Sequence, residues 1–230
     1  MTLHGLQKMT LLDYPGRVAC TLFTFGCNLR CPFCHNAGLV TAPDPSAAIP
    51  EEEVLRFLST RQGLLDGVCV TGGEPLLQPD IADFLAKVKA LGFLVKLDTN
   101  GCYPQALRRV VEAGLVDYVA MDIKNSPAQY PVTVGLPTFD LAPVEESVRY
   151  LLEGHVDYEF RTTVVKELHT TDTVREAARW IAGAPRYYLQ AFVDSGNLIG
   201  QGLTAPDPEQ LRQMVAAARE FVKETALRGV

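Results

Sequence analysis

Six apolar, β-rich segments alternate along this sequence with six amphipathic segments of helical periodicity. The predicted strands are residues 18–25, 67–71, 93–98, 118–123, 158–165 and 186–192. The predicted helices are approximately residues 50–61, 79–90, 104–113, 142–153, 171–182 and 207–228. Near-continuous apolar strands that alternate with helices are typical of parallel β/α units. Six units fall short of the eight strands of a closed (β/α)8 barrel, so the sequence predicts an α/β fold with an open, partial (β/α)6 barrel.

The stretches outside this alternation are predicted to form a short N-terminal extension and two long loops. Residues 5–16 are predicted to be extended and to end in a turn at Pro15-Gly16. Residues 36–49 and 125–139 lack periodicity and are predicted to be surface loops. Loops of this length are usually functional or mobile, but a solvated connector without a role is an equal alternative. Residues 1–230 contain no linker or repeat and are predicted to form one domain.

Composition limits the function classes that this sequence allows. Of 230 residues 47% are hydrophobic, which is enough for one sizeable core. The formal net charge of −6, without a basic run, disfavours nucleic acid as the main partner. Residues 1–17 lack the apolar stretch of a signal peptide, and no window approaches a membrane span. Six cysteines are too sparse for a disulfide scaffold, so a cytoplasmic protein with reduced thiols and no membrane partner is expected.

A tight loop directly after the first predicted strand carries Cys27, Cys31 and Cys34 in the spacing C-x3-C-x2-C. Thiolates are soft ligands that suit iron–sulfur clusters or zinc. A [4Fe–4S] cluster normally takes four cysteines, so three would leave one iron open, as a catalytic zinc site keeps one position open. A zinc site would need His35 as its fourth ligand, which its position beside Cys34 makes strained. A disulfide with a spare thiol lacks a secretory context.

The predicted strands each deliver polar residues near their carboxyl ends. Because active sites of β/α barrels lie at that end, these residues are expected to meet at one rim. They are Gly72, Gly73, Glu74, Asp98, Thr99, Asn100, Asp122, Lys124, Arg161 and Gln190. The glycine pair would let a ligand approach the backbone and leave Glu74 free to accept from an ammonium group. Taken singly, the glycines indicate only a turn, and residues 98–101 only an Asx-type turn.

Some of these residues have a structural alternative. Asp122 and Lys124 point to one face of their strand and could form an ion pair. Arg161 lies within a buried run and needs a carboxylate or a bound ligand as its partner. The remaining cysteines are predicted to be two core residues, Cys20 and Cys69, and a third nearer the rim, Cys102.

Taken together, the cysteine motif, with Phe33 before its last cysteine, and the segment 72–75 resemble the radical S-adenosylmethionine (SAM) superfamily along essentially the whole chain. Residues 10–16, 31–36, 98–101 and 121–124 further resemble the activating enzymes of glycyl-radical proteins. The similarity is greatest to the activating proteins of anaerobic ribonucleoside-triphosphate reductases, with the pyruvate formate-lyase activating enzymes as close relatives.

This resemblance implies a cofactor set and a role for each motif. The three cysteines would hold a [4Fe–4S] cluster, whose open iron the amino and carboxylate groups of SAM would chelate. Phe33 would lie near the adenine, and residues 72–74 would bind the methionyl amino end. The other polar groups of SAM would meet the remaining rim residues Asp98, Thr99, Asn100, Asp122, Lys124, Arg161 and Gln190. In pyruvate formate-lyase activating enzyme the acids matching Asp98 and Asp122 hold a monovalent cation, which is a further candidate here.

The resemblance also implies a radical reaction with a protein partner. An electron from a donor such as flavodoxin or ferredoxin would cleave SAM reductively, and the 5′-deoxyadenosyl radical would abstract hydrogen from a glycine Cα of a glycyl-radical enzyme. One alternative is a radical SAM enzyme for a small molecule, similar to 7-carboxy-7-deazaguanine synthase, which would need extra loops with polar contacts. Another is a non-catalytic iron–sulfur or zinc-binding module.

Overall fold

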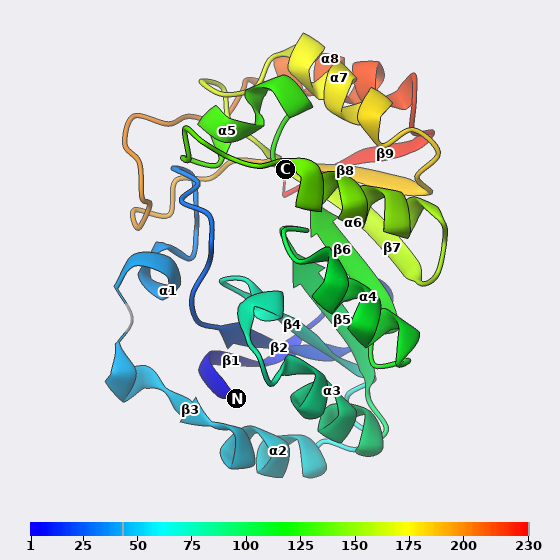
Figure 1. Cartoon of the computed structure of the whole chain (residues 1–230). Helices are drawn as coiled ribbons and strands as arrows, with labels where there is room; N and C mark the ends of the chain where they lie inside the picture. Colours follow the sequence, from blue (N-terminus) through cyan, green and yellow to red (C-terminus); the bar gives the residue numbers. More distant parts are fainter. Residues whose placement is uncertain (43, 230) are drawn as a thin grey trace.

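The computed structural model describes residues 1–42 and 44–229, and shows a curved sheet of nine strands with helices on its outer face (Figure 1). The strands follow the order β3-β1-β2-β4-β5-β6-β7-β8-β9 across the sheet. Their bounds are β1 Thr2–Thr10, β2 Ala19–Thr24, β3 Ile49–Pro50, β4 Gly67–Gly72, β5 Leu94–Thr99, β6 Tyr118–Asp122, β7 Asp157–Val164, β8 Arg186–Ala191 and β9 Glu224–Arg228.

The direction of the strands makes this sheet a partial barrel. Strands β2 and β4 to β9 run parallel to one another. Strand β1 pairs antiparallel with β2 and with β3. The predicted N-terminal extension therefore adds antiparallel strands to the sheet next to β2. The edges are β3 and β9, and no ladder joins them within residues 1–42 and 44–229. The prediction of an open, partial barrel is therefore confirmed.

Six helices cover the outer side of the sheet, and two shorter ones lie at its open side (Figure 1). The outer helices are α2 Glu51–Ser59, α3 Ile81–Ala90, α4 Pro104–Glu112, α6 Ala142–Leu152, α7 Thr171–Trp180 and α8 Pro208–Arg219. The helices at the open side are α1 Ala37–Thr41 and α5 Tyr130–Thr133. Each outer helix begins within two residues of its predicted start.

Local chemistry explains where several helices begin. At the start of α7, Thr170 Oγ1 accepts a hydrogen bond from the N–H of Thr173. At the start of α8, Asp207 accepts from the N–H of Gln210, and Pro208 occupies the first helical position. Each such cap stabilises its helix by about 1 kcal/mol.

Alternation along the strands separates the core from the barrel interior. In β7 the side chains of Phe160, Thr162 and Val164 are buried, while Arg161 and Thr163 line a cavity inside the barrel. Burial of each large apolar side chain stabilises the fold by roughly 1.5–3 kcal/mol. The apolar set therefore holds each strand, and the alternate set is free to carry polar groups.

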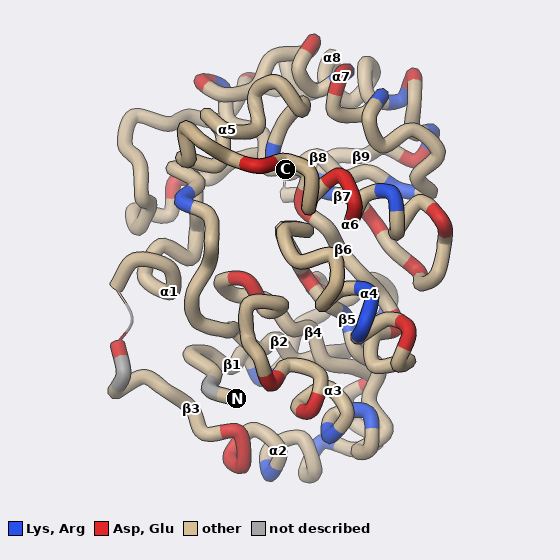
Figure 2. Tube along the Cα trace, viewed as in Figure 1, with Lys and Arg blue, Asp and Glu red and all other residues tan. Residues whose placement is uncertain are grey.

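The outer surface carries charges of both signs. Figure 2 shows Lys and Arg interleaved with Asp and Glu along the outer helices. One exposed group joins Arg175 of α7 to Asp172 at 2.6 Å and to Glu220 at 3.3 Å. Exposed pairs of this kind contribute at most about 1 kcal/mol. Among the helices of the described chain, none has the length and apolar character needed to cross a membrane.

The prediction of one helix over residues 207–228 is wrong in its second half. The helix α8 ends at Arg219, and the strand β9 follows. Residues of good helix propensity, such as Ala226 and Leu227, explain the prediction. Tertiary pairing overrides that propensity, because β9 pairs in parallel with β8 along its whole length. Arg228 also donates to the fully buried carboxylate of Glu159 at 2.6 and 2.9 Å.

The two predicted loops contain more structure than the sequence indicates. Residues 125–139 include a 3₁₀ turn, Pro127–Gln129, and α5. Tyr130 and Val134 are fully buried, and Asn125 donates to Thr133 Oγ1 at 2.9 Å. This segment is therefore no solvated connector. Residues 36–49 include α1 and a second 3₁₀ turn, Pro45–Ala47, whereas residue 43 lies outside the described chain.

Candidate active site

Polar residues from all six predicted strand ends line one cavity of about 420 Å³. The cavity lies at the carboxyl ends of the parallel strands, where β/α barrels place their active sites. The predicted site residues that line it are Cys27, Cys31, Phe33, Cys34, Gly72, Gly73, Asp98, Thr99, Asn100, Asp122, Lys124, Arg161 and Gln190. Of the predicted residues in the described chain, Glu74 is the one outside this lining.

The three motif cysteines line this cavity as free thiols. In residues 1–42 and 44–229 no three Cys, His, Asp or Glu side chains converge on the position of a single metal ion. A [4Fe–4S] cluster does not need such convergence, because each cysteine binds a different iron of the cube. Soft thiol donors around a cavity fit this cluster. Burial raises the pKa of Cys31 to about 12, so iron binding would displace a thiol proton.

Two distant segments hold the cysteine loop, which we define as residues 26–36. The first is the segment after α5, where the carbonyl oxygen of Val134 accepts a hydrogen bond from the N–H of Arg30 in the cysteine loop at 3.0 Å. Gly135 follows with a φ of 70°, and a Cβ there would lie 2.3 Å from Arg30 O. On the other side, the N–H of Gly200 donates to Pro32 O at 2.7 Å. Backbone contacts therefore fix the cysteine loop from both sides.

His35 contacts the start of the loop after β8, at Phe192 and Val193. Its ring lies 5.7 Å from that of Phe192 and is nearly parallel to it. Its Nε2 lies 2.7 Å from the carbonyl oxygen of Val193, which can only accept, so this nitrogen carries the proton. The nitrogen is then not available as a metal ligand.

The glycine pair at the end of β4, Gly72 and Gly73, lets the backbone of this segment approach the backbone at the start of the cysteine loop. A Cβ on Gly73 would lie 1.9 Å from Gly26 O, at the start of the cysteine loop. The next N–H, that of Glu74, donates to the same oxygen at 2.7 Å. These glycines therefore join the end of β4 to the cysteine loop, and both also line the cavity.

The expectation that the Glu74 carboxylate is free for a ligand needs correction. This side chain is fully buried, and its oxygens accept from Leu76 N at 3.0 Å, Thr99 Oγ1 at 2.8 Å and Asn100 N at 2.7 Å. Burial raises the pKa of Glu74 to about 7, although these three donors oppose the shift. Its role is to connect the ends of β4 and β5.

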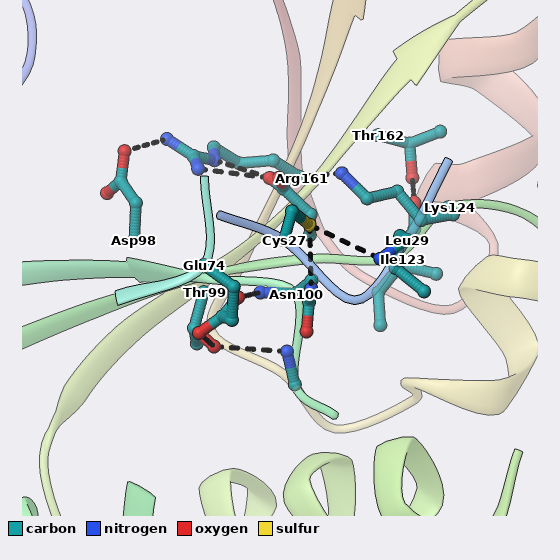
Figure 3. Close-up of polar contacts among 12 residues, drawn as sticks. Cys27, Leu29, Glu74, Asp98, Thr99, Asn100, Ile123, Lys124, Arg161 and Thr162 are labelled. Carbon is teal, nitrogen blue, oxygen red and sulfur yellow. Dashed lines mark hydrogen bonds and ion pairs between the residues drawn. The ribbon is translucent and has the colours of Figure 1, made fainter. Parts of the chain in front are cut away.

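Five buried or half-buried ionisable residues form a continuous ion-pair group on β5 and β7 and at the carboxyl end of β6, which we call the charge cluster. Arg161 bridges two acids: its Nη1 lies 3.1 Å from Asp98 (Figure 3), and its Nη2 lies 3.0 Å from Asp122. Lys124 pairs with Asp122 at 2.9 Å, and Lys96, which is outside the cavity lining, pairs with Asp98. The predicted Asp122–Lys124 pair and the predicted carboxylate partner of Arg161 are therefore present.

Mutual attraction keeps the charge cluster ionised despite its burial. Burial alone would raise the pKa of Asp122, but Lys124 and Arg161 outweigh it and hold the value at about 2. Burial likewise opposes ionisation of Asp98, whose pKa is lowered by Arg161 and Lys96. The cluster holds three cations and two anions, and two of the cations, Lys124 and Arg161, line the cavity. Such a group favours a ligand that carries a carboxylate.

An aromatic contact lies beside the charge cluster. Phe33 is almost fully buried and meets the ring of His169 edge-on, with the centroids 6.4 Å apart. The Nε2 of His169 lies 2.8 Å from Lys124 O, and its Nδ1 accepts from the N–H of Val165 at 3.0 Å. Burial lowers the pKa of His169, so the ring is neutral and braces the backbone at the end of β6.

Sequence reasoning missed several residues of this site. Lys96 sits inside an apolar run, as Arg161 does, so the rule that flagged Arg161 would also have flagged Lys96. Asn36 Nδ2 donates to Gly72 O at 2.8 Å and connects the cysteine loop to β4. Gln7 and Asp13 line the cavity from β1 and its following turn, and no local signal in the sequence indicates this for Gln7.

Comparisons with known proteins agree with this geometry. The sequence profile of the radical SAM superfamily matches residues 21–181. A Methanocaldococcus jannaschii protein with the provisional name glycyl-radical enzyme activating enzyme is 26% identical over 233 residues, which cover 98% of this chain and 95% of that protein. The pyruvate formate-lyase-activating enzyme of Listeria monocytogenes is 32% identical over 160 residues, which cover 64% of this chain and 62% of that enzyme.

Solved structures share the fold at lower sequence identity. A domain of pyruvate-formate lyase-activating enzyme from Bacteroides vulgatus has a TM-score of 0.58 and 19% identity, with coverage of 71% of this chain and 99% of that one. Streptococcus suis SuiB bound to its precursor peptide SuiA has a TM-score of 0.72 and 15% identity, with coverage of 91% and 48%.

The superfamily profile spans well over half of the chain and includes the cysteine loop, the glycine pair and the charge cluster. The protein therefore belongs to the radical SAM superfamily and is an enzyme of that kind. Membership implies a [4Fe–4S] cluster and SAM as the cofactors of the cavity described above.

Proposed function

We propose that this enzyme cleaves SAM reductively at a [4Fe–4S] cluster held by Cys27, Cys31 and Cys34, and generates a glycyl radical on a partner protein. The observation that carries the proposal is one cavity that is lined by three free cysteines and by the cations Lys124 and Arg161 of the charge cluster. The similarity along almost the full length to a protein named as a glycyl-radical enzyme activating enzyme supports the choice of target.

Each side of the cavity has a separate task in this proposal. A [4Fe–4S] cluster held by the three cysteines would supply the electron that cleaves SAM to methionine and a 5′-deoxyadenosyl radical, which would take a hydrogen atom from the glycine Cα. The backbone at Gly72 and Gly73 binds the methionyl amino group. Lys124 and Arg161 of the charge cluster bind the carboxylate, the cluster orients the ribose, and Phe33 packs against the adenine. Gln190 contributes a further polar contact at the end of β8.

We do not propose a monovalent cation between Asp98 and Asp122. The Arg161 guanidinium already bridges the two carboxylates at 3.1 and 3.0 Å. Each acid also has an ammonium partner, Lys96 for Asp98 and Lys124 for Asp122. Two carboxylates with three cations have no charge left for a further ion.

We propose an anaerobic ribonucleoside-triphosphate reductase as the partner, because the motifs in residues 10–16, 31–36, 98–101 and 121–124 resemble the activating proteins of that enzyme class most closely. A flavodoxin or a ferredoxin is the proposed electron donor. A pyruvate formate-lyase is the competing glycyl-radical partner, since the Listeria monocytogenes relative carries that name.

The test is radical transfer to a labelled protein. The enzyme is reconstituted anaerobically with iron and sulfide, reduced, and mixed with SAM and the candidate reductase. A glycyl-radical electron paramagnetic resonance signal is expected on the partner. When the partner is deuterated at glycine Cα, deuterium is expected in the 5′-deoxyadenosine.

Two outcomes would contradict parts of this proposal. Deuterium transfer from a purified small metabolite, with no partner protein present, would reassign the target while leaving the radical SAM chemistry in place. A reconstituted protein that binds iron but yields no 5′-deoxyadenosine with any reductant would point to the non-catalytic alternative.

A further inference from the structure

Two hydrogen bonds converge on one cysteine sulfur of the predicted cluster site. Cys27 Sγ accepts from the N–H of Leu29 at 3.4 Å and from Nδ2 of Asn100 at 3.7 Å (Figure 3). Leu29 belongs to the cysteine loop itself, whereas Asn100 lies 73 residues away, in the turn after β5. Within the described residues, no side chain donates a hydrogen bond to the sulfur of Cys31 or Cys34. Cys27 is therefore set apart from the other two ligands.

The orientation of the Asn100 amide follows from its other contacts. Its Oδ1 accepts from the N–H of Cys102 at 2.9 Å, so the opposite end of the amide must be the nitrogen. That nitrogen has two hydrogens, and one of them goes to Asn28 Oδ1 at 2.8 Å. The second hydrogen is the one that points to Cys27 Sγ. Asn100 is 6% exposed, so water does not compete for this donor.

Glu74 holds the turn that carries this amide. Its Oε2 accepts from the backbone N–H of Asn100 at 2.7 Å, and its Oε1 accepts from Thr99 Oγ1 at 2.8 Å. Because Glu74 also accepts from Leu76 N at 3.0 Å, the carboxylate joins the ends of β4 and β5 directly beneath Cys27. The hydrogen bond to the sulfur thus comes from a rigid support rather than from a mobile side chain.

We propose that Asn100 is a positioning residue for the iron–sulfur cluster, which orients Cys27 and raises the reduction potential of the cluster, with Glu74 fixing the turn. The physical reason is that reduction adds negative charge to the cysteine sulfurs. A hydrogen-bond donor stabilises the reduced state more than the oxidised state. This inference rests on the cluster of the proposed function.

The experiment compares the full-length protein with two variants at this position. Each protein is reconstituted anaerobically with iron and sulfide, and the potential of its cluster is determined by a titration followed by electron paramagnetic resonance, without SAM. Asn100→Ala removes the donor, so the ratio of reduced to oxidised cluster at a given potential should fall about tenfold, which is 59 mV for a one-electron couple.

Asn100→Asp is the second variant, chosen because it keeps the fold of the turn. Its side chain still accepts from the N–H of Cys102 but presents an oxygen to the sulfur in place of the nitrogen. The potential should therefore shift further in the same direction. Cys102→Ala is the matched control, since it alters the same turn and keeps the backbone N–H, and it should show the wild-type potential.

The outcomes distinguish a failure of the role proposed for Asn100 from a failure of the proposed function. Equal potentials in Asn100→Asp and the wild type, at equal iron content, would overturn the inference and leave the proposed function standing. A wild-type protein that forms no [4Fe–4S] signal would instead refute the proposed function. Loss of iron from both Asn100 variants, with unchanged far-ultraviolet circular dichroism and full iron in Cys102→Ala, would support the positioning role, because Cys27 would no longer be held.

Discussion

The two sides of the cavity are built with opposite chemistry. On the cysteine side, backbone hydrogen bonds to Glu74 and Val134 hold the loop, together with the side-chain amides of Asn36 and Asn100. On the other side, the charge cluster holds itself together with five ionised side chains, and Arg161 lies at its centre. The end of β5 and the turn after it contribute to both sides, since Asp98 in the strand faces the ions and Asn100 in the turn faces the sulfur.

The difference shows how one barrel rim can serve a metal cluster and a charged ligand together. Charges near an iron–sulfur cluster change its reduction potential, so neutral hydrogen bonds can position the ligands with less electrostatic disturbance. A zwitterionic ligand is bound best by charges that are already in position. Arg161 meets this requirement, because Asp98 and Asp122 hold its guanidinium between them in the free protein. Geometry dominates one side of the cavity and electrostatics the other.

The largest expected effect comes from removing a cluster ligand on the neutral side. Cys31→Ala should abolish most iron binding and all SAM cleavage, because the cube would lose one of its three protein ligands. Iron content and 5′-deoxyadenosine formation measure this. Cys20→Ala is the control, because Cys20 is a fully buried core residue and its truncation should cost on the order of 1 kcal/mol. Loss of the cluster in the control but not in Cys31→Ala would refute the ligand assignment.

On the charged side, Arg161→Met should destabilise the fold by about 3 kcal/mol and weaken SAM binding. The side chain is 13% exposed and bridges two half-buried acids, which would keep only Lys96 and Lys124 as partners among the described residues. Urea unfolding and isothermal titration with SAM measure both effects. Arg175→Met, which breaks an exposed pair, should cost less than about 1 kcal/mol. Equal losses of unfolding free energy in Arg161→Met and Arg175→Met would show that the charge cluster is no more important for stability than an exposed ion pair.

The pH dependence of stability tests whether Glu74, which supports the turn beside Cys27, is protonated in the folded protein. Burial raises the pKa of Glu74 from 4.5 to about 7. Its contribution to stability is therefore complete below pH 4.5 and is lost as the pH rises to about 7. Since 1 pKa unit corresponds to about 1.4 kcal/mol, the loss amounts to roughly 3 kcal/mol. Glu74→Gln cannot titrate, so the difference in unfolding free energy between variant and wild type should change across this window. A constant difference would show that Glu74 is ionised throughout.

The smallest expected effect concerns the contact that closes over the cysteine loop. Gly135→Ala should destabilise the protein by about 2 kcal/mol, because the residue has a φ of 70° and its Cβ would lie 2.3 Å from Arg30 O. Gly154→Ala is the matched control, with a φ of 79° and open space around its Cβ, and should cost about 1 kcal/mol. Thermal unfolding and iron retention after reconstitution measure the two. Equal iron retention would mean that this contact does not position the cluster loop.

Local patterns were sufficient to predict the barrel and the place of the site. Short segments of sequence are enough to recognise an apolar strand and the polar residues at its end. Once the barrel was predicted, its geometry alone implied that Asp98, Asp122 and Arg161 converge. The cysteine spacing likewise indicates a cluster without any knowledge of the fold.

What the sequence did not predict depends on contacts between distant segments. Glu74 was expected to be free, but its orientation is set by donors from the turn after β5. Residues 224–228 have helix propensity, and only the free edge of β8 makes them a strand. The packing of residues 125–139 depends on buried groups such as Tyr130, which no periodicity reveals.

The pairing of β9 also has a consequence for the order of events during synthesis. Glu159 leaves the ribosome 69 residues before Arg228, the residue that neutralises it inside the barrel. Until β9 is made, the nascent chain carries a carboxylate whose buried position lacks this cation, and the parallel edge of β8 is open to other chains. Completion of the sheet at this edge must therefore wait for the seventh parallel strand, and until then the partly translated chain exposes the unprotected edge of β8.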